Sequence, residues 1–356
     1  MSSLYKAEKS CQATCCNTLA PGYTSEQTIV DLIEKDSELF KTFVKYIFVG
    51  VQSGKDEVFF VSKEDVVKND LEAEILHPIL KGKDVRRYEL NWSDTFIIYP
   101  YHEDNTVINE TELKTKHPNV FKYLSDNSSL LSDRPYFEKS NKAWYELWCE
   151  RKLSKFKEIK IVNAEISPEN RFYLDNQGYL GNTKIFCTVL KEKYRDRYLY
   201  FLGLLNSKLF NYYHKQIASP KAGGFYDYKT QFISLYPIKL DSCYLQIDFL
   251  VQLIASYLNT SHKSFLLISE IIDALVFEIY FPYHMKERKI DVLGFVEKDI
   301  EEVMQNREFR ALSDIQKEQV VTELHKHWID PESEIVKRMN SFAEKSPEIL
   351  KPILEG

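Results

Sequence analysis

A change in the spacing of apolar residues near Leu240 constrains the fold of this chain more than any other feature of its sequence. Before Leu240, short runs rich in β-branched and aromatic residues alternate with turn residues, which is typical of strands and short helices. After Leu240, apolar residues recur at helical spacing, as at Ile268, Ile272, Leu275 and Ile279. We therefore predict an α/β (α+β) region of twisted, mostly antiparallel sheets with packed helices, followed by a helical C-terminal region.

The chain divides into three predicted parts. Residues 1–24 are polar without periodicity and are expected to be a loose lead-in. Residues 25–240 form the α/β domain, and residues 241–356 form the helical region. The expected elements before the boundary are a helix over 25–47, strands at 57–61, 96–99, 159–164 and 184–189, a helix around 120–124, a loop at 125–132, a helix from 198 to about 214, and a loop over 219–229.

Charge is distributed unevenly along the chain, although the net charge is only −6. Residues 131–232 contain 18 Lys and Arg against 11 Asp and Glu, a local charge of +7. Residues 240–356 contain 13 against 21, a local charge of −8. A basic middle beside an acidic tail predicts one face for a polyanion and another face for a different partner.

The cysteines and the apolar runs indicate the cellular compartment in which the protein is expected. The six cysteines match neither a zinc ligand set nor a dense disulfide framework, so reduced thiols are expected. No apolar run approaches the roughly 20 residues that a membrane-spanning helix needs. The N-terminus lacks the apolar segment of a secretory signal. We therefore expect a cytoplasmic protein with no membrane partner.

The motifs of several catalytic chemistries are missing or weak in this sequence. There is no Gly-x-Gly loop, and no two prolines are adjacent, so the cofactor loop and the Asn-Pro-Pro-Tyr type cluster of adenine methyltransferases are absent. Glu158-Ile-Lys160 matches the Glu-x-Lys fragment of metal-dependent nucleases. The alternative, which we favour, is that Glu158 and Lys160 face solvent on either side of an inward Ile159. His214 is expected to make a helix-dipole contact at a helix end.

Basic and aromatic residues gather in three stretches, at 81–88, 139–151 and 215–229. Such residues can neutralise phosphates and pack against sugars or unstacked bases. The double glycine at 223–224 would allow a close approach of the backbone to a groove. An ordinary solvated surface is the alternative interpretation. Our candidate DNA-binding residues are Lys81, Lys83, Arg86, Arg87, Lys142, Lys221, Gly223, Gly224, Tyr226 and Lys229.

These stretches resemble the C-terminal specificity region of TaqI- and Eco57I-type adenine-specific DNA methyltransferases and fused restriction–modification enzymes. The resemblance runs from about Ile29 to the C-terminus and rests on several pieces in the same order. The similar pieces are Val49–Phe60, Pro78–Tyr88, Lys160–Ser167, Phe201–Leu209, Gly223–Phe232, Leu235–Ile238 and Ile272–Phe281.

The resemblance implies that residues 25–240 are a TaqI-like DNA target-recognition domain that reads double-stranded DNA mainly in the major groove. It implies a recognition component of a restriction–modification or related phage-defence system. We expect no catalytic, cofactor or metal site here, because S-adenosylmethionine chemistry would belong to a separate adenine-N6 methyltransferase or nuclease subunit. Two alternatives stay open: a metal-dependent nuclease that uses Glu158 and Lys160, or an inactive truncated remnant of a fused enzyme.

Overall fold

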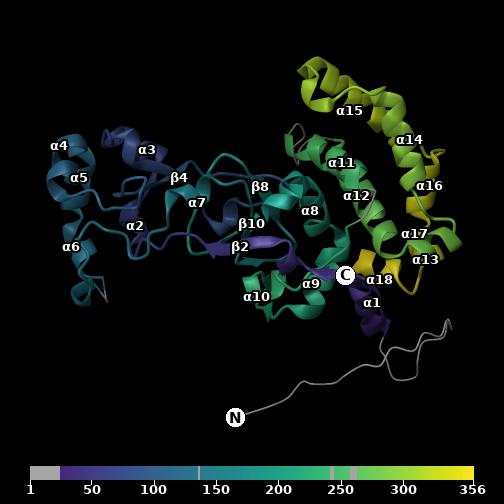
Figure 1. Cartoon of the computed structure of the whole chain (residues 1–356), viewed down its shortest axis with the longest axis horizontal. Helices are drawn as coiled ribbons and strands as arrows, with labels where there is room; N and C mark the ends of the chain where they lie inside the picture. Colours follow the sequence, from purple (N-terminus) through teal and green to yellow (C-terminus); the bar gives the residue numbers. More distant parts are fainter. Residues whose placement is uncertain (1–24, 135–136, 241–243, 257–262) are drawn as a thin grey trace, which may run out of the picture.

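The computed structural model describes residues 25–134, 137–240, 244–256 and 263–356. It is a mixed α/β structure with mostly antiparallel sheets and a helical C-terminal region, as the sequence predicts. Figure 1 shows an elongated molecule with small helices at one end, the sheets in the middle and an arc of helices at the other end. The predicted lead-in, residues 1–24, lies outside the described residues.

A four-stranded antiparallel sheet forms the centre of the α/β region. Its strand order is β2 (Val44–Val49), β10 (Ile185–Leu190), β6 (Lys160–Ala164) and β8 (Phe172–Asp175). Every residue of β6 and β10 is buried, because the sheet is covered on both faces. The predicted strands at 159–164 and 184–189 are therefore confirmed as β6 and β10.

A second four-stranded sheet has the order β3 (Phe60–Ser62), β5 (Thr95–Ile98), β4 (Leu76–Leu80) and β9 (Leu180–Gly181). Its β4–β9 pair is parallel, and the other pairs are antiparallel. The two sheets approach each other at Gly50, where an added Cβ atom would lie 2.0 Å from the Gly181 carbonyl oxygen. Only glycine fits at such a contact.

A third sheet carries the predicted loop over 219–229, which is a β-hairpin in the structure. Strands β11 (Pro220–Lys221) and β12 (Phe225–Asp227) pair with each other, and β12 also pairs with β7 (Ile166–Ser167). Gly223 and Gly224 both have φ +77°, a left-handed conformation that favours glycine. The double glycine thus closes the hairpin turn.

The structure corrects the predicted helix over 25–47. Helix α1 spans only Ser25–Glu34, and strand β1 (Glu38–Leu39), a turn and β2 follow. The helix ends because Asp36 adopts φ 56°, while the Ser37 hydroxyl donates to the Ile33 carbonyl at 2.9 Å. Residues 44–49 then pair with β10, and this long-range pairing overrides their helical spacing.

Three other local predictions differ from the structure. The expected strand at 57–61 begins as helix α2 (Asp56–Phe59), and the expected loop at 125–132 contains α6 (Ser128–Ser132). The helix expected from 198 to about 214 is two helices, α8 (Tyr198–Leu205) and α9 (Lys208–Ile217). It breaks at Asn206, whose side chain bonds both backbone groups of Phe172 on β8. Strand β5 and helix α5 (Pro118–Asp126) agree with the predictions at 96–99 and 120–124.

All elements that the structure describes after residue 240 are helices, which confirms the predicted helical C-terminal region. Its elements are α11 (Tyr244–Ser256), α12 (Phe265–Tyr280), α13 (Pro282–Glu287), α14 (Leu293–Met304), α15 (Asp314–Ile329), α16 (Glu334–Asn340), α17 (Phe342–Lys345) and α18 (Leu350–Glu355). One hydrophobic core joins α8 and α9 to α11 and α12, and a second core fills the space between the first two sheets. The division near residue 240 stays a prediction, because the first core contains residues from both sides of it.

No helix within the described ranges is both long enough and apolar enough to cross a membrane. The two described cysteines, Cys149 and Cys187, are free thiols. Burial raises the pKa of the Cys187 thiol to about 12, so this thiol is protonated and inert at neutral pH.

Candidate nucleic-acid interface

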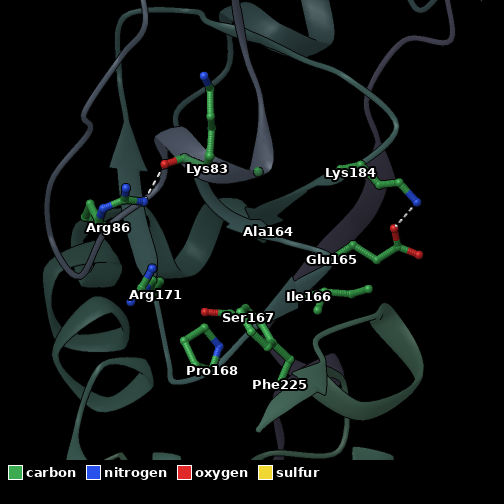
Figure 2. Close-up of a pocket in the computed structure, with 11 residues that line it drawn as sticks. Lys83, Arg86, Ala164, Glu165, Ile166, Ser167, Pro168, Arg171, Lys184 and Phe225 are labelled. Atoms are coloured by element: carbon green, nitrogen blue, oxygen red, sulfur yellow. Dashed lines mark hydrogen bonds and ion pairs between the residues drawn. The ribbon is translucent and has the colours of Figure 1, made fainter. Parts of the chain in front are cut away.

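A surface pocket of about 460 Å³ lies where the central sheet, a basic turn and the glycine hairpin meet. The turn contributes η3 (Gly82–Asp84) and Arg86, and the hairpin contributes Phe225. Figure 2 shows Arg86 and Arg171 on one side of the pocket and Lys184 on the other. The remaining lining residues are Ala164, Glu165, Ile166, Ser167 and Pro168. The pocket therefore presents several cations around a partly apolar floor.

The basic turn takes its shape from the buried carboxylate of Asp84. This carboxylate accepts a hydrogen bond from the Lys81 backbone N–H at 2.7 Å, and the Asp84 N–H donates to the Lys81 carbonyl at 2.9 Å. The Arg86 guanidinium donates back to the carbonyls of Lys83 and Val85. Arg86 is thereby held against the turn, while the exposed Lys83 side chain extends from it (Figure 2).

Two apolar side chains stand exposed beside these cations. Ile166 is 45% exposed and Phe225 is 38% exposed, although both are large hydrophobic residues. Their backbones are fixed, because Ile166 pairs with Asp227 in the third sheet and Phe225 pairs with Lys221. Rigid apolar groups next to arginine and lysine suit a ligand that has both anionic groups and flat or methylated faces.

The lysines at one side of the pocket are held by carboxylates. Lys184 Nζ lies 2.6 Å from Glu165 Oε2, and Lys229 Nζ lies 3.4 Å from Glu165 Oε1. Lys229 also lies 3.1 Å from Asp227 Oδ2, and Lys221 lies 3.6 Å from the same oxygen. The hydrogen bonds to Asp227 and then to Glu165 raise the pKa of Lys229, so its ammonium stays charged.

The structure brings two of the three predicted basic stretches together. Lys83 and Arg86 line the pocket, and the hairpin that carries Lys221, Gly223, Gly224, Tyr226 and Lys229 forms its border. Lys81 lies next to the turn with its Nζ 5.6 Å from the centre of the Phe60 ring. The direct DNA-contact role of these residues stays a prediction.

Arg87 and Lys142 lie elsewhere. The Arg87 guanidinium lies 3.4 Å from the carboxylate of Asp273 on α12, so it joins the basic turn to the helical region. Lys142 is paired with Glu150 at 2.9 Å and Glu146 at 3.5 Å, and it does not line the pocket. Neither side chain lines the pocket, so we leave both out of the candidate interface.

Arg171 and Lys184 line the pocket but were not among the residues predicted from the sequence. Both belong to the stretch with a local charge of +7. That charge excess was the only sequence signal for them, since neither belongs to one of the basic and aromatic clusters. Arg171 is held by Glu169 at 2.9 Å, and it reaches the pocket because β8 follows β7 across a short turn.

His214 corrects the prediction of a helix-dipole contact. Its ring is fully buried and stacks on Tyr228, with 3.8 Å between the ring centres, and its Nδ1 lies 2.8 Å from the Tyr236 hydroxyl. Burial lowers the pKa of His214 to about 3, so the imidazole is neutral at physiological pH. A neutral ring gains little from the helix dipole. His214 instead packs in the core against Tyr228 and Tyr236 of the segment that follows the hairpin.

The position of the Lys160 side chain corrects the prediction that Glu158 and Lys160 both face solvent. The Lys160 side chain is 0% exposed, forms an ion pair with Asp175 on β8 and donates to the Phe156 carbonyl at 2.5 Å. Glu158 is engaged elsewhere, with Lys45 at 2.9 Å and the Tyr46 hydroxyl. The two residues therefore have separate partners. Among the described residues, no group of three or more His, Cys, Asp or Glu side chains could hold a metal ion.

Comparisons with known proteins find similar sequences over part of the chain. Residues 77–238 match the family model of the TaqI-like C-terminal specificity domain. The type II methyltransferase M.MjaIV of Methanocaldococcus jannaschii is 32% identical over 185 residues, which are 49% of this chain and 58% of that protein. M.BanIII of Aneurinibacillus aneurinilyticus is 26% identical over 198 residues, covering 53% of this chain and 34% of that protein.

A solved structure of the Type IIL restriction-modification enzyme MmeI in complex with DNA is similar at 12% identity with a TM-score of 0.48. The match covers 66% of this chain and 32% of that one. Each of these relatives is thus spanned only in part by the chain. The class that these matches indicate is a specificity domain: residues 77–238 match that family model, and the chain is also similar to two type II methyltransferases. The particular model is the TaqI-like C-terminal specificity domain, so the predicted resemblance is confirmed over residues 77–238.

Proposed function

We propose that this chain recognises specific sequences in double-stranded DNA as a component of a restriction–modification or related phage-defence system. A separate subunit would supply adenine-N6 methyl transfer or cleavage, and S-adenosylmethionine would bind to that subunit. The observation that carries the proposal is the position of the cationic pocket. It is built from the turn, the strand ends and the hairpin of the segment that matches the specificity family.

The chemistry of the pocket fits a duplex. Lys83 and Arg86 offer charge to phosphates, and Arg171 and Lys184 extend the same surface. The exposed Ile166 and Phe225 side chains offer apolar contact to base edges or sugars. Phosphate contacts would set the position of the duplex, while base contacts would select the sequence.

The proposal of a separate catalytic subunit rests on motifs. The sequence contains no Gly-x-Gly and no adjacent prolines, which an adenine methyltransferase uses for its cofactor and for the extruded adenine. The acidic helical region, with its local charge of −8, offers a surface that does not compete for DNA. We propose that this region docks the catalytic partner.

Fluorescence anisotropy with a labelled duplex tests the proposal. The double variant Lys83→Ala/Arg86→Ala removes two pocket cations, whereas Lys114→Ala/Lys122→Ala removes two cations from the small helices at the far end of the molecule (Figure 1). Each lost phosphate contact flattens the slope of log K against log salt by about 0.9, so we expect a change of about 1.8 in the pocket variant only.

Failure of the wild-type chain to bind duplex at low salt, with the companion methyltransferase present, would refute DNA recognition. Equal salt slopes for the pocket variant and its control would remove this pocket from the interface. Docking is a separate question: co-purification of a methyltransferase or nuclease from nuclease-treated extract of the native host would support the partner proposal.

A further inference from the structure

Five alternating charges run along one border of the pocket, in the order Lys184, Glu165, Lys229, Asp227 and Lys221. We call them the charge row. Neighbouring members lie 2.6, 3.4, 3.1 and 3.6 Å apart. Because the row joins the end of the central sheet to the glycine hairpin, charged residues that are far apart in the sequence interact electrostatically.

The carboxylates of the row lie beneath its lysines. The side chains of Glu165 and Asp227 are 14% and 5% exposed, whereas those of the three lysines are 41–61% exposed. A phosphate that arrives from solvent would therefore meet the ammonium groups first. It would also be repelled by two carboxylates that lie one contact further away, and this repulsion is less screened than between exposed charges.

The geometry also shows what the carboxylates are engaged with. Each oxygen of Glu165 already faces a lysine, Lys184 at Oε2 and Lys229 at Oε1. Asp227 Oδ2 faces Lys221 and Lys229. Asp227 Oδ1 accepts from the Lys229 backbone N–H at 3.3 Å. The two carboxylates are therefore engaged with lysines rather than with the amino group of a base.

We propose that Glu165 and Asp227 are counter-charges that weaken sequence-independent binding of DNA to this face. This inference rests on the proposed function. A surface with free lysines would hold any duplex through its phosphates. Lysines that are already paired gain less from a phosphate, so a larger share of the affinity must come from contacts that depend on the sequence.

The test measures binding of the full chain to a labelled duplex of random sequence, by anisotropy, between about 50 and 200 mM salt. Glu165→Gln removes one half-buried negative charge and keeps the size of the side chain. The matched control is Glu110→Gln, which removes the same charge from the exposed pair with Lys114 on α4 (Glu110–Lys116). We expect Glu165→Gln to bind about three- to tenfold more tightly than the control.

Two further variants keep the test decisive. Glu165→Asp retains the charge and should bind like the wild type. Asp227→Asn removes the second carboxylate and should also bind more tightly, and it decides the question if Glu165→Gln loses its circular dichroism spectrum.

The outcomes separate this inference from the proposed function. Wild-type binding together with no gain for Glu165→Gln or Asp227→Asn over Glu110→Gln would overturn the counter-charge role and leave DNA recognition intact. Absence of binding by the wild type and by every variant would instead overturn the proposed function, on which the inference depends.

Discussion

Replacing Lys160 by methionine separates a structural role of this residue from a catalytic one. Lys160 is fully buried in β6 and forms an ion pair with Asp175, whose side chain is also 0% exposed. Methionine has a similar length and no charge. The variant would therefore leave the Asp175 carboxylate inside the protein without its cation, although the N–H groups of Gln177 and Gly178 would still donate to it.

The size of the effect follows from this burial. Breaking a buried ion pair by removal of one partner costs about 3–5 kcal/mol, whereas an exposed pair is worth about 1 kcal/mol or less. Such a loss is a large share of the roughly 5–15 kcal/mol that stabilises a typical domain. For a cooperatively unfolding chain of 356 residues it corresponds to a fall in melting temperature of roughly 4–7 °C.

A double variant identifies the cause of the loss. Lys160→Met/Asp175→Asn removes the unpaired charge and keeps an acceptor for the N–H groups of Gln177 and Gly178. We expect it to recover more than half of the free energy of unfolding lost in Lys160→Met, because the penalty comes mainly from the isolated carboxylate. Urea denaturation followed by circular dichroism measures the free energy of unfolding of the wild type, of Lys160→Met and of the double variant, which are the three values that the comparison needs.

Two results would contradict this reasoning. A Lys160→Met variant within about 0.5 kcal/mol of the wild type would show that the pair is not buried as described. If that equally stable variant also lost a metal-dependent cleavage that the wild type displays, Lys160 would be catalytic and the nuclease hypothesis would replace ours.

Two other predictions concern buried groups near the interface. Since burial holds the pKa of His214 at about 3 against 6.5 in an unfolded chain, the unfolded state binds the additional proton as pH falls below 6.5. His214 should therefore cost the wild type about 2 kcal/mol of stability as the pH falls from 6.5 to 5. In urea titrations at these pH values, the free energy of unfolding of His214→Gln should depend correspondingly less on pH. An unchanged pH dependence in this variant would contradict a neutral buried ring. Arg87→Met should lower stability by about 3 kcal/mol, because it leaves Asp273 buried and unpaired, but it should not change the salt slope of DNA binding. A flatter slope would place Arg87 at the interface after all.

Local sequence patterns were sufficient to predict those elements whose structure depends mainly on their own residues. The strands at 95–98 and 160–164 and the helix opened by Pro118 follow from β-propensity and a helix start signal within a few residues. Prediction failed where contacts with a distant segment override the local preference. The helix break at Asn206 depends on bonds to Phe172, 34 positions earlier, and no spacing rule contains that contact.

The candidate site shows the same division. The basic turn and the glycine hairpin were visible as separate stretches, because clustered cations and a double glycine are local features. Lys184 was not recognised, since it stands alone in the sequence and becomes part of the pocket only when β10 pairs with β6. The burial of Lys160 was missed for the same reason, because its partner Asp175 lies on the neighbouring strand.

The sequence by itself determined the class of fold, the presence of a helical C-terminal region, and the resemblance to the TaqI-like specificity domain. These properties depend on periodicity and on runs of residues, which a linear chain displays directly. Only the tertiary structure decided which charges are paired, which are buried and which face one pocket. Electrostatic interaction depends on distance in space and on exposure to water, and strand pairing sets both for residues that are far apart along the chain.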